Sequence, residues 1–264
     1  ALPIYLADTK YRTGNFLAGT DVDLPATCCT AGHWSFIVFL IFTRMMNTLP
    51  KSIVCIGAGN VATHLSKALQ QQGFQLLQVY SRTEESARTL AQALGCEWTT
   101  QLAQVCEQAD VYIVSVKDAV LETVIDQLAH CNSEALYLHT AGSMPMEVWK
   151  GKRKNYGVVY PMQTFSKQRE IRMEEVPFFL EANTAENLDL LRKLTEHLSP
   201  KVYEASSAQR KYLHIAAVFA CNFSNHMYAI CEHLLTAHQL PFESMLPLID
   251  ETARKVHELS PLEA

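Results

Sequence analysis

From Lys51 onward, short runs of apolar residues alternate with longer runs in which apolar residues recur every three or four positions. Short apolar runs are typical of buried strands, and the longer spacing is typical of helices with one buried face. We expect strands at Ser52–Ile56, Gln75–Tyr80, Val111–Val116, Leu136–His139, Tyr156–Tyr160 and Pro177–Glu181, with short strands within Gly95–Thr99 and Lys201–Glu204. We expect helices at Val61–Gln71, Glu84–Leu94, Ala119–Ala129 and Ala185–Leu198. The alternation predicts an α/β fold with a doubly wound, mostly parallel sheet covered by helices on both faces.

The pattern changes after Glu204, where only helical spacing remains. Ser206, with Gln209 three positions later, is typical of a capped helix N-terminus. A run without Gly or Pro extends from Arg210 to about His238, so we expect one long helix there and a second over Phe242–Leu259. Two helices make a poorly covered domain, so we expect the helical domain to be truncated where this sequence ends.

The first 49 residues show no sustained period and differ from the rest of the chain. Their apolar run, Phe36–Phe42, is far shorter than the roughly 20 residues that span a bilayer, which argues against a membrane-tethered form. Arg44 follows this run, whereas a signal peptide carries its charge before the run. We expect the native protein to start at Met45 or Met46, which N-terminal sequencing of the native protein would test. The predicted organisation is therefore an extension at 1–49, a nucleotide-binding domain at 50–204 and a helical domain at 205–264.

The composition is that of a globular protein and excludes some partners. Apolar residues make up 48% of the 264 residues, and the net charge of -5 argues against a nucleic-acid partner. The eight cysteines include no CxxC pair, which favours thiols acting as small buried hydrophobes in a reducing cytoplasm. Adjacent Cys28 and Cys29 carry no zinc-like pattern, and His226, His233 and His238 lack an accompanying HExxH motif, so we predict no metal site.

The first candidate site is the glycine turn after the first predicted strand. Gly57 permits a sharp turn, Gly59 lets a pyrophosphate approach the backbone, and Ala62 lets the following helix pack closely. The free N–H groups at that helix N-terminus attract phosphate. The alternative is a purely structural glycine turn in an unrelated α/β protein. The cofactor-binding residues predicted here are Gly57, Ala58, Gly59, Asn60 and Val61.

The end of the second strand bears on which dinucleotide binds. NAD-binding sheets usually place an acid there for the ribose hydroxyl, but this chain has Ser81, Arg82 and Thr83. A guanidinium between two hydroxyls suits a 2′-phosphate, so we favour NADP, with NAD possible as cofactor. The alternative is an ordinary surface arginine before a helix that Thr83 caps.

Two later strand ends face the same edge of the predicted sheet, where ligands of open α/β sheets bind. From their position we predict that Ser115, Val116, Lys117, Thr140, Ala141 and Gly142 contact the cofactor. His139 is a candidate catalytic residue, and Ser143 lies near the site. Lys117 could equally be a solvated lysine at a helix start, and a strand-end histidine is often only structural.

The long C-terminal helix supplies the other catalytic candidates. At 100° per residue, Cys221 and Asn225 fall within about 20° of His214, on a stripe of small and apolar residues. Polar groups on such a face need partners, so the alternatives are satisfied core residues or a subunit interface. The functional interpretation is that this helix closes a cleft. His214 then donates a proton to a carbonyl or imine, and Asn225 or Asn222 orients the substrate.

Together, the segments GAGNVATHL, YSRT, LHTAGS, VVYPMQTFSK and LHIAAVFACNFSNHMY resemble a family of bacterial oxidoreductases. Its members join a Rossmann-like domain to a helical C-terminal domain of unassigned function, the DUF2520 type. That family is similar to pyrroline-5-carboxylate reductase, ketopantoate reductase and the F420-dependent NADP reductases. The resemblance covers about Ser52 to Ala264. It implies a nucleotide-binding sheet, a cleft between two domains and a homodimer formed through the helical domain, and it supplies no substrate or agreed catalytic residue.

Two functions from different classes follow from the sequence. The first is an NAD(P)-dependent oxidoreductase that transfers hydride to or from a small carbonyl or imine compound, with no membrane partner. The second is a non-catalytic nucleotide-binding regulator or scaffold that uses the same fold, because fold alone does not establish activity. The polar residues on the long helix favour the first, and the absence of an acid–base residue at a familiar catalytic position favours the second.

Overall fold

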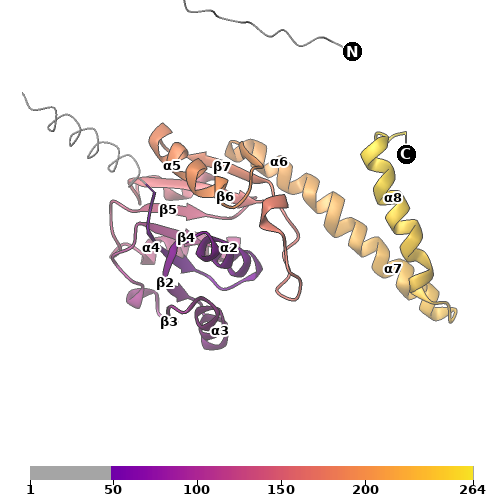
Figure 1. Cartoon of the computed structure of the whole chain (residues 1–264), viewed down its shortest axis with the longest axis horizontal. Helices are drawn as coiled ribbons and strands as arrows, with labels where there is room; N and C mark the ends of the chain where they lie inside the picture. Colours follow the sequence, from indigo (N-terminus) through magenta and orange to yellow (C-terminus); the bar gives the residue numbers. More distant parts are fainter. Residues whose placement is uncertain (1–48, 264) are drawn as a thin grey trace, which may run out of the picture. The chain divides into compact units, whose positions relative to one another are not determined.

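A computed structural model describes residues 49–263 of the chain. Its centre is one eight-stranded sheet in the order β3-β2-β1-β4-β5-β6-β7-β8. The strands are β1 (Ser52–Ile56), β2 (Gln75–Tyr80), β3 (Glu97–Thr99), β4 (Val111–Val114), β5 (Leu136–His139), β6 (Asn155–Pro161), β7 (Phe178–Ala182) and β8 (Val202–Glu204). Neighbouring strands are parallel except β6 and β7. Figure 1 shows this order from β3 at the bottom of the view to β7 near the top.

The helices alternate with these strands and then continue alone. They are α2 (Asn60–Gln71), α3 (Glu84–Leu94), α4 (Leu121–Gln127), α5 (Ala185–Glu196), α6 (Ser207–Ala217), α7 (Ser224–Ala237) and α8 (Leu246–Glu258). Short 3-10 turns precede α4 at Asp118–Val120 and α8 at Phe242–Met245, where we expected continuous helices. The predicted doubly wound, mostly parallel sheet followed by helices is confirmed.

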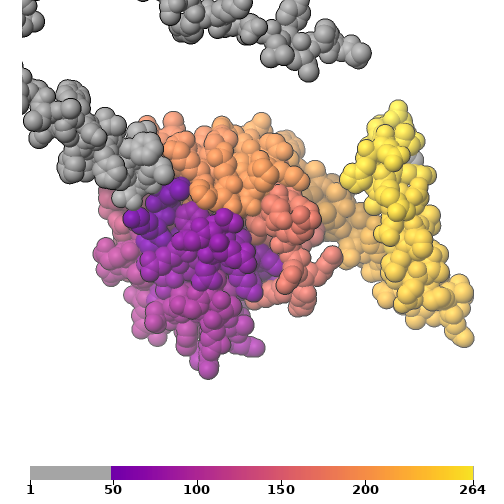
Figure 2. Space-filling model, viewed as in Figure 1, coloured from indigo at the N-terminus to yellow at the C-terminus, as the bar shows by residue number. Residues whose placement is uncertain are grey.

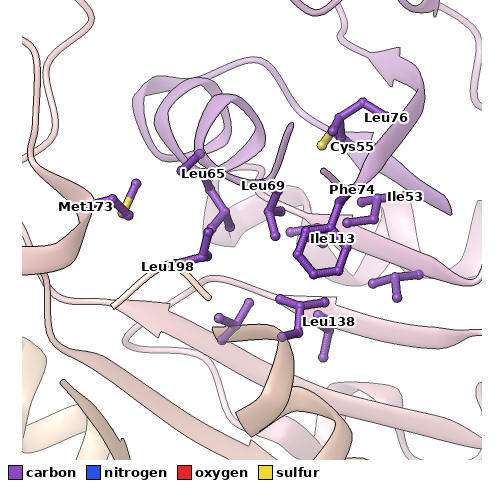
Figure 3. Packing of buried hydrophobic residues seen from close by; sticks show 14 of the residues in the cluster. Ile53, Cys55, Leu65, Leu69, Phe74, Leu76, Ile113, Leu138, Met173 and Leu198 are labelled. Atoms are coloured by element: carbon purple, nitrogen blue, oxygen red, sulfur yellow. The ribbon is translucent and has the colours of Figure 1, made fainter. Parts of the chain in front are cut away.

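Alternate residues of each strand pack on opposite faces of the sheet, which produces two separate hydrophobic clusters. Ile53 and Cys55 of β1 belong to the cluster under α2, α3 and α5, while Val54 and Ile56 belong to the cluster under α4. Figure 3 shows Leu65 and Leu69 of α2 pointing toward the sheet residues of the first cluster. Burial on both faces explains why these strands are apolar without alternation in the sequence.

The cysteines of the described residues are all free thiols. Cys55 lies in the core, where burial raises the pKa of its thiol to about 12. A thiol held in this protonated form behaves as a small hydrophobic side chain, which agrees with the sequence interpretation. Cys28 and Cys29, like the apolar run Phe36–Phe42 and the start expected at Met45 or Met46, lie outside the described residues.

The start of α6 follows the sequence prediction closely. Ser206 and Gln209 form a complete capping box, in which each side chain satisfies a backbone N–H of the other residue. The expected single helix from Arg210 to His238, however, is interrupted by a π-helical turn, η5, at Val218–Phe223. A π turn holds one extra residue, so every residue after it is rotated relative to an uninterrupted α-helix.

This rotation corrects one prediction about the long helix. Asn225 follows the π turn and is displaced by roughly 100°, one residue's rotation, from the line of His214. Asn225 and Asn222 are both exposed. The predicted stripe shared by His214 and Asn225 is therefore wrong, because it assumed a constant 100° step through residues that do not keep it.

Helices α7 and α8 have no buried residue in the described part of the chain. Their large apolar side chains are instead exposed, among them Met227, Ile230, Leu234, Leu248 and Val256. Figure 2 shows these helices in the orange and yellow part of the chain. None of the helices that the structure describes has the length and apolar character needed to cross a membrane.

Candidate functional site

A cleft of about 720 Å³ opens where the carboxyl ends of β1, β2 and β4 meet. Several predicted cofactor residues line it, namely Gly57, Ala58, Gly59, Asn60, Ser81, Arg82, Thr83, Ser115, Val116 and Lys117. The lining does not include Val61, Thr140, Ala141 or Gly142. The structure thus brings three separate strand ends, which the sequence suggested one at a time, to one cavity.

The glycine turn has the conformation that its sequence requires. Gly57 adopts a φ of 120°, and a Cβ at this position would lie 2.2 Å from the carbonyl oxygen of Ser115. The Gly57 N–H donates to the Tyr80 carbonyl at 2.7 Å, which ties the turn to the end of β2. Any larger residue at Gly57 would therefore displace β4 from β1.

Gly59 has a different role from Gly57. A Cβ built at Gly59 would meet no atom within 4 Å, so the space in front of it is open. Gly59 occupies the N-cap position of α2, and no side chain caps this helix. The first N–H groups of α2 are consequently available to a phosphate at the edge of the cleft.

Three cations line the cleft, Arg82, Lys117 and Lys167, and its lining includes no Asp or Glu. None of the three forms an ion pair within residues 49–263. Thr83 stands at the N-cap position of α3 but makes no side-chain capping bond there. Uncompensated positive charge beside free helix N–H groups fits a ligand with several phosphates, such as NADP.

A second group of polar residues lies at the neighbouring end of β5. Thr140 Oγ1 donates to Ser115 Oγ at 3.0 Å, and Ser115 lines the cleft. Ser143 Oγ donates to the carboxylate of Asp118, which lies in the 3-10 turn before α4. The bond from Thr140 to Ser115 connects the loop after β5 directly to a residue that lines the cleft.

Gly142 lies in that loop, close to both β6 and α6. A Cβ at Gly142 would lie 2.8 Å from the Tyr160 ring and 2.9 Å from His214 Nδ1. Tyr160 Oη lies 3.3 Å from the same nitrogen, and burial raises the pKa of the Tyr160 phenol. The end of β6 and the last turn of α6 therefore meet at the loop after β5, beside the cleft.

Tyr160 was not among the residues predicted from sequence, although it belongs to the VVYPMQTFSK segment. A tyrosine near the end of an apolar strand is most simply a core residue, and only its contact with His214 singles it out. Lys167, the last residue of the same segment, was also missed, because no pattern in the sequence connects it with the glycine turn.

The structure contradicts the prediction that His139 is a catalytic residue. Its side chain has no exposed surface, and its ring stacks on Trp149 with a centroid separation of 6.3 Å. The Ala141 N–H donates to His139 Nδ1 at 3.2 Å. Burial, assisted by the charge of Arg210, lowers the pKa of His139 to about 3, so the ring is a neutral structural group.

Arg210 fixes the position of α6 on the sheet. Its side chain is fully buried, and its guanidinium donates to Glu181 on β7 at 2.5 Å and to the Met144 carbonyl at 2.7 Å. Ser207 adds hydrogen bonds to both oxygens of the Glu181 carboxylate. The same network thus joins α6, β7 and the loop after β5.

The comparisons with known proteins agree with this geometry. Residues 52–141 match the family described as NADP oxidoreductase, coenzyme F420-dependent, and residues 176–264 match a domain of unknown function, DUF2520. A solved candidate NADP oxidoreductase from Bacteroides fragilis is 57% identical, over 80% of this chain and 82% of that chain, with a TM-score of 0.77. No curated protein matches the chain significantly.

More distant solved structures share the fold alone. An imine reductase from Myxococcus stipitatus in complex with NADP⁺ is 18% identical, over 78% of this chain and 73% of that chain, with a TM-score of 0.61. A 1-pyrroline-5-carboxylate reductase from Streptococcus pyogenes is 15% identical, over 80% and 82%, with a TM-score of 0.62. The family matches and the 57% identity show that the chain belongs to the NADP oxidoreductase family that combines an F420-dependent NADP oxidoreductase domain with a DUF2520 domain.

Proposed function

We propose that this protein is an NADP-dependent oxidoreductase acting on a small carbonyl or imine compound. The observation that carries the proposal is the cleft beside Gly59, with three uncompensated cations and no acid in its lining. The relatives add support for a nicotinamide cofactor, because they include reductases and oxidoreductases, and an imine reductase was solved with NADP⁺ and, as a variant, with NAD⁺. In this proposal the substrate binds beside the cleft, near the contact of Tyr160 with His214.

Each part of the cleft has a role in holding the dinucleotide. The N–H groups at the start of α2 receive the pyrophosphate, and Arg82, with Ser81 and Thr83, receives the 2′-phosphate. Ser115, Val116 and Lys117 form the wall toward the loop after β5. When bound, the nicotinamide supplies the hydride chemistry, and the protein's part is orientation, electrostatics and proton supply.

His214 is the proton donor in this proposal, and Tyr160 sets its tautomer. In this proposal the Tyr160 hydroxyl donates to His214 Nδ1, which lies 3.3 Å away, and burial favours the protonated phenol that this donation requires by raising its pKa. The imidazole then carries its proton on Nε2, which leaves that N–H for a substrate oxygen or nitrogen. His139 takes no part because it is buried, and Asn225 takes no part because the π turn rotates it away from the line of His214.

The alternative is a nucleotide-binding regulator or scaffold without turnover. It is favoured by the small number of acid–base groups beside the cleft, which the burial of His139 reduces further. A screen of carbonyl and imine compounds with NADPH separates the two functions. Tight NADPH binding without turnover of any compound would support the regulator.

The exposed apolar residues of the C-terminal helices support a homodimer. Tyr212, Phe219 and Phe223 are exposed, and the rings of Phe219 and Phe223 stack at 5.0 Å. Exposed patches of this kind mark interaction surfaces, and a second copy offers the same patch. Phe219→Glu in η5 should shift the protein toward monomer in sedimentation velocity, whereas Lys211→Glu in α6 should not. A monomeric wild-type protein would contradict this proposal.

Gly59→Val should abolish NADPH binding while the protein remains folded. A Cβ at Gly59 meets no neighbouring atom within 4 Å, and the methyl groups of a valine would occupy the space in front of the α2 N-terminus. We expect an affinity loss of at least 100-fold, about 3 kcal/mol, by fluorescence titration. The cost in stability should be near 1 kcal/mol, because valine is a poor N-cap. Unchanged affinity would mean that this turn is structural only.

Arg82→Ala should weaken NADP⁺ far more than NAD⁺. A charge-assisted hydrogen bond contributes about 1.5 to 3 kcal/mol, so the dissociation constant for NADP⁺ should rise roughly 10- to 100-fold. The constant for NAD⁺, which lacks the 2′-phosphate, should change less than about twofold. Arg88→Ala, an exposed arginine further along α3, is the matched control. Equal losses for both nucleotides would contradict the assignment of Arg82 to the 2′-phosphate.

His214→Ala should lower turnover by roughly 10²- to 10⁴-fold, the usual contribution of a general acid. NADPH affinity should stay within about threefold, because His214 does not line the cofactor cleft. His233→Ala, an exposed histidine on α7, serves as control. Steady-state kinetics with the compound found in the screen checks this. If affinity and turnover fall together, His214 has a structural role instead.

A further inference from the structure

The segment after β6, residues 163–170, is attached to the first turns of α2. Asn60 Nδ2 donates to the Phe165 carbonyl at 2.9 Å, and His64 Nε2 lies 2.9 Å from the Ser166 carbonyl. The Phe165 and His64 rings are also in contact, with centroids 5.5 Å apart. Two side chains of the glycine-turn helix thus hold two consecutive carbonyls of a segment about a hundred positions away in the sequence.

Lys167 follows these two anchored residues directly. It is exposed, and within residues 49–263 it forms neither an ion pair nor a side-chain hydrogen bond. It nevertheless lines the cleft that Gly59 and Asn60 also line. The contacts of Asn60 and His64 with residues 165 and 166 therefore place the unpaired ammonium group of Lys167 on the side of the cleft where α2 begins.

The physical chemistry of this position favours an anion. An ammonium group binds phosphate as a point charge, and its attraction adds to that of the helix N-terminus. A partly enclosed cleft without an acid screens this charge less than bulk water does. Arg82 stands instead after β2 and is assigned to the 2′-phosphate, which leaves the pyrophosphate assigned to the start of α2 as the partner for Lys167.

We propose that Lys167 binds the pyrophosphate of the nucleotide, and that Asn60 and His64 are positioning residues that act through it. This inference rests on the proposed function, since it assigns a residue to the same cofactor. It also changes the role of Asn60, which was predicted to bind the cofactor itself. The side-chain amide of Asn60 donates to the Phe165 carbonyl, so the contribution of this side chain to affinity runs through the position of Lys167.

Titration of wild-type and variant proteins with NADP⁺ and NAD⁺ tests Lys167. Lys167→Ala should raise the dissociation constants for both nucleotides by the same factor, about fivefold to tenfold, because both carry the pyrophosphate. Added NaCl should weaken nucleotide binding less in this variant than in wild type. Arg169→Ala, an exposed cation of the same segment outside the cleft lining, should change neither constant.

A double-mutant cycle tests the role of Asn60. Asn60→Ala alone should weaken both nucleotides about threefold, and it should add little in the Lys167→Ala background, because coupled residues are not additive. Additive effects would overturn the positioning role. Unchanged affinity in Lys167→Ala, with tight binding by wild type, would overturn the inference alone. Failure of wild type to bind either nucleotide would overturn the proposed function as well.

Discussion

The buried ion pair between Arg210 and Glu181 determines how the helical part of the chain meets the sheet. Arg210 has no exposed surface, and removing its charge from water is costly unless its donors find partners. The partners come from β7 and from the loop after β5, so α6 can start at only one place. His214 lies one helical turn beyond Arg210, on the same face, and is thereby carried to Tyr160. The catalytic pair that we propose depends on this one interaction.

Two glycines then set how closely the elements approach. At Gly57 the chain turns with a φ of 120° against the Ser115 carbonyl, which brings the ends of β1 and β4 together. At Gly142 the loop after β5 passes within contact distance of both Tyr160 and His214. A Cβ at either position would overlap neighbouring atoms, so the close approach of these elements depends on residues that lack one. The bond from Thr140 to Ser115 joins the two regions.

The cleft itself is defined by charge more than by shape. Its cations follow β2, β4 and β6. No Asp or Glu lines it, although acids pair with arginines elsewhere in residues 49–263. Positive charge placed in this way is unfavourable without a ligand and favourable with a phosphate-rich one. The capping positions of α2 agree with this, since Gly59 leaves the helix N-terminus uncapped while Ser206 caps α6 completely.

The sequence by itself determined the parts of this protein that depend on local pattern. The strand ends at Ile56, Tyr80 and His139, the glycine turn and the capping box at Ser206 were all predictable, because each follows from periodicity or from residues a few positions apart. The π turn in the long helix was not predictable, because one extra residue in a helix produces no repeating pattern in the sequence. The burial of His139, the contact of Tyr160 with His214 and the delivery of Lys167 to the cleft were decided only by the tertiary structure. Each of these depends on which distant segments pack together, and the packing surfaces come into existence only when the sheet has formed.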